Sequence, residues 1–76
     1  MDVKRSVTLA GHRTSVALEA EFWAALKDIA QDEGLSQNAL IAKIDAARLD
    51  DGEAAGNLSR AIRLYILRHY QERKTP

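Results

Sequence analysis

Two short stretches near the N-terminus alternate apolar and polar residues with the period of a β-strand. The first covers residues 5–9 and ends at the breaker Ala10-Gly11-His12, and the second covers 13–18. The second stretch leads without a turn signal into a helical pattern that begins near Glu19. We therefore expect 13–18 to be the principal strand. Residues 5–9 are open to three interpretations: the principal strand itself, an extra strand beside it, or part of an arm that is ordered only on a ligand.

A strand at 13–18 requires a partner, because one strand alone leaves backbone N–H and C=O groups unpaired. The chain has few other strand candidates, so the simplest partner is the same strand of a second copy. Such pairing makes dimerisation part of the fold. It also leaves Arg13, Ser15 and Ala17 facing outward from a two-stranded ribbon, which is narrow enough to enter the major groove of DNA.

Helical patterns account for most of the remaining chain. A first helix is expected over 20–32 with Gly34 as its left-handed stop, and a second helix follows Ser36, its N-cap, to about residue 49. A last helix over 58–72 has a broad apolar surface, which indicates burial against more than one neighbour and favours a dimer core. The predicted organisation is a basic arm, a strand-helix-helix core, an acidic loop and a C-terminal helix with its tail, over residues 1–12, 13–49, 50–57 and 58–76.

Length and composition limit how this chain can be stabilised. A chain of 76 residues makes one small core, and the absence of cysteine excludes disulfides and thiolate zinc sites. Oligomerisation is the remaining way to add stability. There is no apolar run long enough to span a bilayer and no signal-peptide pattern, so we expect a cytoplasmic protein without membrane contact.

The charges are distributed unevenly although the formal net charge is zero. Residues 1–13 carry a net +2, residues 14–57 a net −6 and residues 58–76 a net +4. Twofold assembly doubles each basic end, which suits a surface that faces phosphates.

The order of strand, helix, turn and helix over residues 13–45 resembles the ribbon-helix-helix DNA-binding proteins, the superfamily of the Arc and methionine repressors. The residues that carry the resemblance are Arg-Thr-Ser-Val-Ala-Leu-Glu at 13–19, Gly-Leu-Ser-Gln-Asn-Ala-Leu-Ile at 34–41 and Ile-Asp at 44–45. Within that superfamily, the chain resembles a group of short bacterial members with a third, C-terminal helix. The resemblance implies a mainly α fold with one short β-strand, in an intertwined homodimer whose antiparallel ribbon enters the major groove of double-stranded DNA. It also implies a sequence-specific transcriptional repressor.

The resemblance assigns roles to individual positions. Arg13, Ser15 and Ala17 match the base-facing strand positions, and the chemistry of Arg13 agrees, because a guanidinium can donate two hydrogen bonds to guanine. Ala17 departs from the more polar residue often found at its position. Contacts to DNA phosphates are expected from the arm and from the start of the second helix, whose N-terminus offers oriented N–H donors: Lys4, Arg5, Ser36, Gln37 and Asn38.

Other chemistries have little basis in the sequence. His12 and His69 are too few for a legible metal site, no nucleophile and base are paired, and we expect neither a cofactor nor enzymatic activity. Trp23 is expected in the core or the dimer interface. Two alternatives are left open: an antitoxin-like interaction module whose C-terminal helix docks on a protein partner, and a degenerate member that dimerises without reading DNA.

Overall fold

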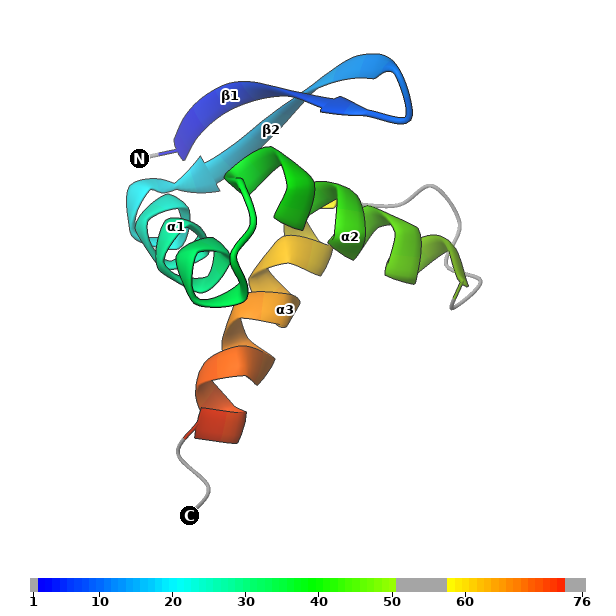
Figure 1. Ribbon diagram of the computed structural model, residues 1–76. Coiled ribbons are helices and arrows are strands. Elements are labelled where there is room, and N and C mark those ends of the chain that lie inside the picture. The colour runs from blue at the N-terminus through cyan, green and yellow to red at the C-terminus, as the bar shows by residue number, and fades with distance from the viewer. Residues whose placement is uncertain (1, 51–57, 74–76) are drawn as a thin grey trace.

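The computed structural model describes residues 2–50 and 58–73. The elements are two strands and three helices, in the order β1 (Asp2–Leu9), β2 (His12–Glu19), α1 (Ala20–Glu33), α2 (Gln37–Asp50) and α3 (Leu58–Arg73). The strands form a hairpin at one end of the molecule, and α3 runs away from it, so the C-terminal end of the chain lies opposite the hairpin (Figure 1). The predicted acidic loop lies outside the described residues apart from Asp50, the last residue of α2.

The prediction of a single short strand is wrong, because β2 pairs antiparallel with β1 of the same chain. The pairing runs from Asp2 opposite Glu19 to Leu9 opposite His12. Of the three interpretations of residues 5–9, the structure supports the extra strand beside the principal one, and this strand begins already at Asp2. The physical reason is the tight turn between them. Ala10 and Gly11 have φ values of 51° and 80°, and positive φ at both central residues is the requirement of a type I′ turn, which suits a two-residue hairpin.

The helices follow the sequence pattern closely because their ends carry local signals. Gly34 ends α1 in the left-handed conformation at φ 70°, as predicted, and Leu35 N–H then reaches back to the Ala30 carbonyl at 2.8 Å. Ser36 is confirmed as the N-cap of α2, since its hydroxyl oxygen accepts a hydrogen bond from Ala39 N–H at 3.0 Å. Within the described part of the chain, none of the helices is both long and apolar enough to cross a membrane.

The core lies between one face of the hairpin and all three helices. The contribution of β1 is small, since Val7 is its only buried residue, whereas β2 buries Val16 and Leu18. Trp23 is 4% exposed, which confirms its predicted place in the core, and its Nε1–H donates to the Val3 carbonyl at 2.7 Å. The helices supply the other buried side chains: Leu26, Ile29, Ala30, Leu40, Ile41, Ile44, Ile62 and Ile66.

A polar junction joins the three helices at their sides. The Glu33 carboxylate of α1 accepts hydrogen bonds from Lys43 Nζ of α2 at 2.7 Å and from the Tyr65 hydroxyl of α3 at 2.6 Å. The bond from Lys43 and then that from Tyr65 hold the pKa of Glu33 below its usual value. Burial of the Tyr65 hydroxyl, followed by its bond to Glu33, raises the pKa of Tyr65. The junction therefore favours a charged carboxylate and a neutral phenol at neutral pH.

Candidate nucleic-acid interface

The hairpin has one face on the core and one face in solvent. Residues directly opposite each other share a face, and successive pairs alternate between faces. The pair of Val16 and Arg5 therefore belongs to the core side, as does that of Leu18 and Val3. The solvent face, which we call the outer face, consists of Lys4 opposite Ala17, Ser6 opposite Ser15 and Thr8 opposite Arg13. All of these are exposed except Ala17, which is half-buried.

The outer face contains the three residues that were predicted to face the bases and two further residues that were not predicted to have a role. Arg13, Ser15 and Ala17 lie side by side along β2, as expected for base-facing positions. Ser6 and Thr8 were not predicted to be functional, yet β1 brings them directly beside these residues. The signal that could have found them is the alternation over 5–9 followed by Ala10-Gly11, an X-Gly dipeptide between two alternating stretches.

Positive charge lies toward both ends of the outer face, at Arg13 near the turn and at Lys4 near the open end. The open end also carries carboxylates, at Asp2 and Glu19. Arg63 of α3 binds Glu19 through its Nε at 3.0 Å and through a terminal guanidinium nitrogen at 2.9 Å. A backbone hydrogen bond, together with the bond from Arg63, holds the pKa of Glu19 below its usual value. The Glu19 carboxylate is thus charged but compensated by a cation beside it.

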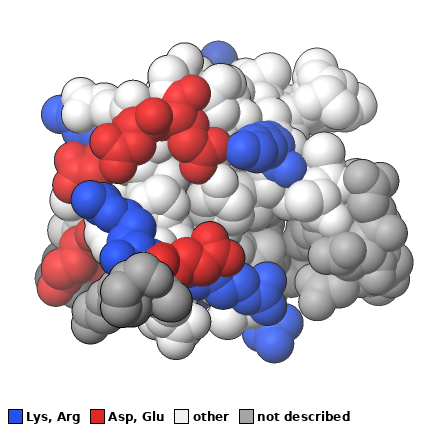
Figure 2. Space-filling view, turned by 60° about the horizontal axis from the view of Figure 1, so that its bottom comes forward, with Lys and Arg blue, Asp and Glu red and all other residues white. Residues whose placement is uncertain are grey.

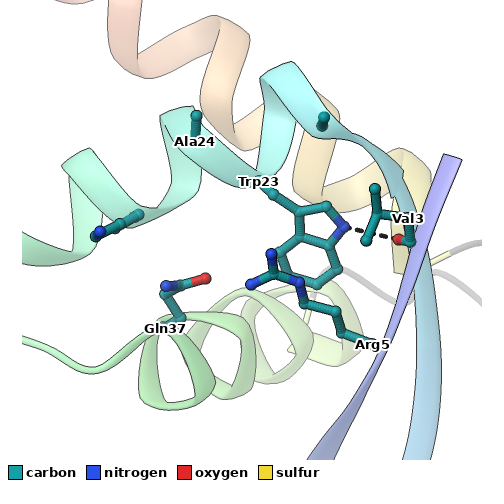
Figure 3. A pocket seen from close by; sticks show the side chains of 7 residues that line it. Val3, Arg5, Trp23, Ala24 and Gln37 are labelled. Carbon is teal, nitrogen blue, oxygen red and sulfur yellow. Dashed lines mark hydrogen bonds between the residues drawn. The ribbon is translucent and has the colours of Figure 1, made fainter. Parts of the chain in front are cut away.

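Arg5 does not share a face with its neighbour Lys4. Its guanidinium lies over the Trp23 ring, 5.0 Å from the ring centroid, on the helix side of β1. Arg5 lines a hollow of about 270 Å³, which Gln37 also lines from the start of α2. Figure 3 shows the two side chains on either side of this hollow's opening toward Trp23. Lys27 of α1 also lines the hollow, and the lining contains no carboxylate among the described residues. Arg5 of β1 and Lys27 of α1 thus place two cationic side chains next to the first turn of α2.

The three residues predicted at the start of α2 have different environments. The Ser36 hydroxyl is used by the helix cap, and the first backbone hydrogen bond of the helix runs from Leu40 N–H to the Ser36 carbonyl at 3.0 Å. The N–H groups of Gln37 and Asn38 precede that bond, so they are available to an external acceptor. The Asn38 side chain is occupied: its Oδ1 accepts from Thr8 N–H and its Nδ2 donates to the Thr8 carbonyl, both at 2.8 Å.

The side of the molecule away from the hairpin differs in charge from the outer face. Figure 2 shows acidic side chains gathered there, with basic side chains between and beside them. Exposed carboxylates of α1 include Glu21, Asp28 and Asp32. This distribution directs a polyanion toward the hairpin rather than toward α1.

The C-terminal helix exposes little apolar surface. Ile62 and Ile66 are buried, Leu64 and Tyr65 are half-buried, and Leu67 is 52% exposed. In the described part of the chain, Leu67 and Val3 are the only large hydrophobic residues that are exposed. One exposed leucine is not a contiguous apolar patch, so α3 gives no support to the alternative of a docking helix for a protein partner.

Comparisons with known proteins identify one family. The family model described as "Ribbon-helix-helix domain" matches residues 2–70, which is nearly the whole chain. Neither the curated proteins nor the solved structures contain a significant match. The match includes β1 and reaches into the last turns of α3, so the hairpin and the third helix both fall within the matched domain.

Proposed function

Because this chain belongs to the ribbon-helix-helix family, a family of DNA-binding regulators, we propose that it is a homodimeric, sequence-specific DNA-binding protein that represses transcription. In this proposal the β1–β2 hairpin enters the major groove with its outer face toward the bases. The observation that carries the proposal is the outer face itself. It is narrow, polar and free of carboxylates between Lys4 and Arg13, and a two-stranded ribbon fits the width of the major groove.

The base contacts that we propose lie on β2. Arg13 donates two hydrogen bonds to guanine O6 and N7, and Ser15 donates to or accepts from a neighbouring base. The methyl group of Ala17 contacts a thymine methyl. Ser6 and Thr8, which lie opposite Ser15 and Arg13, add hydroxyl groups that read either a donor or an acceptor.

The phosphate contacts that we propose flank the ribbon. The N–H groups of Gln37 and Asn38 point from the positive end of the α2 dipole, and Ser36 fixes the geometry of that helix end. Arg5, held over Trp23, supplies a cation beside this end. Lys4 reaches a phosphate from the open end of the outer face. Such contacts position the protein on the duplex, whereas the β2 contacts carry the sequence information.

The proposal is tested by titrating the protein with duplex DNA at several salt concentrations. Arg13→Ala is expected to weaken binding to a selected site by about 5- to 150-fold, since a bidentate contact to guanine is worth roughly 1–3 kcal/mol. Binding of Arg13→Ala to random DNA is expected to fall much less. Equal losses on both DNAs would show that Arg13 contacts a phosphate rather than a base.

Lys4→Ala and Arg68→Ala form a matched pair for the phosphate contacts. Both variants remove one exposed cation, but Arg68 lies on α3, away from the outer face. Lys4→Ala is expected to reduce the slope of log K against log salt by about 1, and Arg68→Ala is expected to leave it unchanged. Absence of DNA binding at low salt by the folded protein would contradict the proposed function.

A further inference from the structure

The hollow beside Trp23 is built from three separate elements. Its lining includes Val3 and Arg5 of β1, Lys27 of α1 and Gln37 from the first turn of α2. In the register of the hairpin, Val3 and Arg5 face the helices, so the hollow lies on the opposite side of β1 from the outer face. Its volume of about 270 Å³ is just below the roughly 300–1,000 Å³ that is usual for pockets of drug-sized ligands. The hollow therefore has room for a small organic molecule.

One wall of the hollow is a cation held over an aromatic ring. The Arg5 guanidinium lies 5.0 Å from the centroid of the Trp23 ring, and the ring is fixed because its Nε1–H donates to the Val3 carbonyl at 2.7 Å (Figure 3). Cation–π attraction does not require the N–H donors of the guanidinium. Among the described residues, Arg5 has no hydrogen-bond or ion-pair partner for these donors. A planar guanidinium in this state can bind a carboxylate through two parallel hydrogen bonds.

Lys27 is the second cation of the hollow, and it also lacks a counter-charge. Several cations of the helices are bound to carboxylates: Lys43 to Glu33, Arg63 to Glu19 and Arg73 to Asp32. Lys27, by contrast, forms no ion pair with another described residue, and no described carboxylate lines the hollow. Uncompensated positive charge in a concave site concentrates anions there, because the walls focus the field. The charge of the hollow therefore favours an anionic ligand.

The remaining lining of the hollow is apolar apart from one amide. Ala20 and Ala24 lie one turn apart on α1 and present only methyl groups, and Val3 is 36% exposed beside them. The Gln37 side chain supplies an amide that can donate to an oxyanion. A ligand that suits this lining has a carboxylate at one end and a flat, apolar body. A phosphate of the DNA backbone would meet the cations with its oxygens but would leave the apolar wall uncovered.

We propose that the hollow is a binding site for a small carboxylate with a flat, apolar body, held by Arg5 and Lys27, and that this ligand weakens DNA binding. The second part, the regulatory part, rests on the proposed function, in which Arg5 supplies a cation to a DNA phosphate. A guanidinium that binds the carboxylate through both of its parallel donors is no longer available to that phosphate. The carboxylate also brings a negative charge next to the start of α2, where it repels phosphates.

The site is tested by an NMR titration of the labelled protein with benzoate, without DNA and at constant ionic strength. Benzamide is the matched control, because it has a similar shape and no charge. The chain has one tryptophan, so its indole N–H gives a single signal that reports on the hollow. Benzoate is expected to shift this signal and the amides of residues 3–5, 24–27 and 37 saturably, and benzamide is expected to bind at least about 5-fold more weakly. Absence of a saturable shift, or equal binding of benzamide, would overturn the site.

Four variants separate the hollow from a general attraction of anions to cations. Arg5→Gln is expected to weaken benzoate binding by at least about 10-fold, and Lys27→Gln by about 2- to 5-fold. Ala24→Leu fills the hollow without a change of charge and is expected to abolish binding. Arg68→Gln removes an exposed cation of α3 that does not line the hollow and is expected to leave the affinity unchanged. Equal losses in Arg5→Gln and Arg68→Gln, or undiminished binding by Ala24→Leu, would overturn the site.

The regulatory part is tested by titrating the parent and Ala24→Leu with random-sequence duplex DNA at constant ionic strength. Replacing chloride by saturating benzoate is expected to weaken DNA binding of the parent by about 2- to 5-fold, the contribution of one exposed cation contact. The DNA affinity of Ala24→Leu is expected not to respond to benzoate. An unchanged DNA affinity of the parent with the hollow saturated would overturn the regulatory part. A protein that binds no DNA in any of these conditions would contradict the proposed function and the regulatory part together, whereas the NMR titration without DNA would still decide the site.

Discussion

The contact between Asn38 and Thr8 gives the sharpest prediction about what holds the hairpin on the helices. The Asn38 amide makes two hydrogen bonds to the backbone of β1, each at 2.8 Å, near the turn end of the strand, whereas Trp23 binds the Val3 carbonyl near its other end. Replacing Asn38 by alanine removes both bonds and leaves the Thr8 N–H and carbonyl to water.

The magnitude follows from the number of bonds and their exposure. A hydrogen bond contributes a net of about 0.5–1.5 kcal/mol, and these two lie at the lower end because both partners are solvent-accessible. Asn38→Ala is therefore expected to lower the free energy of unfolding by about 1–2 kcal/mol. For a chain of this size that change corresponds to a decrease of roughly 4–16 °C in Tm.

Thermal unfolding followed by circular dichroism measures the Tm, and amide hydrogen exchange measures the Thr8 N–H. Exchange at Thr8 is expected to accelerate by at least about 5-fold, the factor that corresponds to 1 kcal/mol. Ser36→Ala is the matched control, since losing an N-cap costs about 1 kcal/mol without touching β1. In Ser36→Ala, the exchange rate of the Thr8 amide should rise by no more than the factor that corresponds to the loss in global stability. An unchanged Tm and an unchanged Thr8 exchange rate in Asn38→Ala would refute the role of Asn38 in holding β1.

Three further predictions concern the core, a helix end and the polar junction. Trp23→Phe removes the donor to the Val3 carbonyl and part of the core volume, and urea unfolding followed by circular dichroism should show a loss of about 1–3 kcal/mol. Gly34→Ala meets no atom within 4 Å, so only its positive φ opposes the substitution, and the same assay should show a loss of about 1–2 kcal/mol. The pKa of Glu33 is lowered in the folded state, so its contribution to stability is present above pH 4.5 and is lost as the pH falls through the folded pKa. Glu33→Gln should therefore be less stable than the parent at pH 7 and should lose less stability than the parent on acidification; parallel pH profiles would contradict the assignment.

The helices could be predicted from the sequence because their signals are local. Gly34 and Ser36 set a stop and a start within two residues of each other, and the apolar spacing of α1 places Leu26, Ile29 and Ala30 toward the core. These signals act within one or two turns of helix, so they can be recognised in a short contiguous stretch of sequence.

The partner of β2 could not be predicted in the same way. The alternation over 5–9 is compatible with a strand, but Ala10-Gly11 is a weaker hairpin signal than Asn-Gly, and pairing within a chain competes with pairing between copies. The contacts that hold the hairpin on the helices come from distant positions: Asn38 lies 30 residues from Thr8 of β1, and Arg63 lies 44 residues from Glu19 of β2. No local sequence pattern predicts such long-range contacts. The composite nature of the candidate site, with Ser6 and Thr8 beside Ser15 and Arg13, follows from the same pairing and was missed for the same reason.

The proposed function depends on the outer face of the hairpin being the surface that binds DNA. The most direct measurement is an NMR titration of the labelled protein with duplex DNA, followed at the backbone amides. We expect the largest shifts at residues 4–8 and 13–17 and at Gln37 and Asn38, while α3 beyond Leu67 changes little. Binding with the largest shifts on α3, and with the amides of the hairpin unchanged, would contradict this expectation.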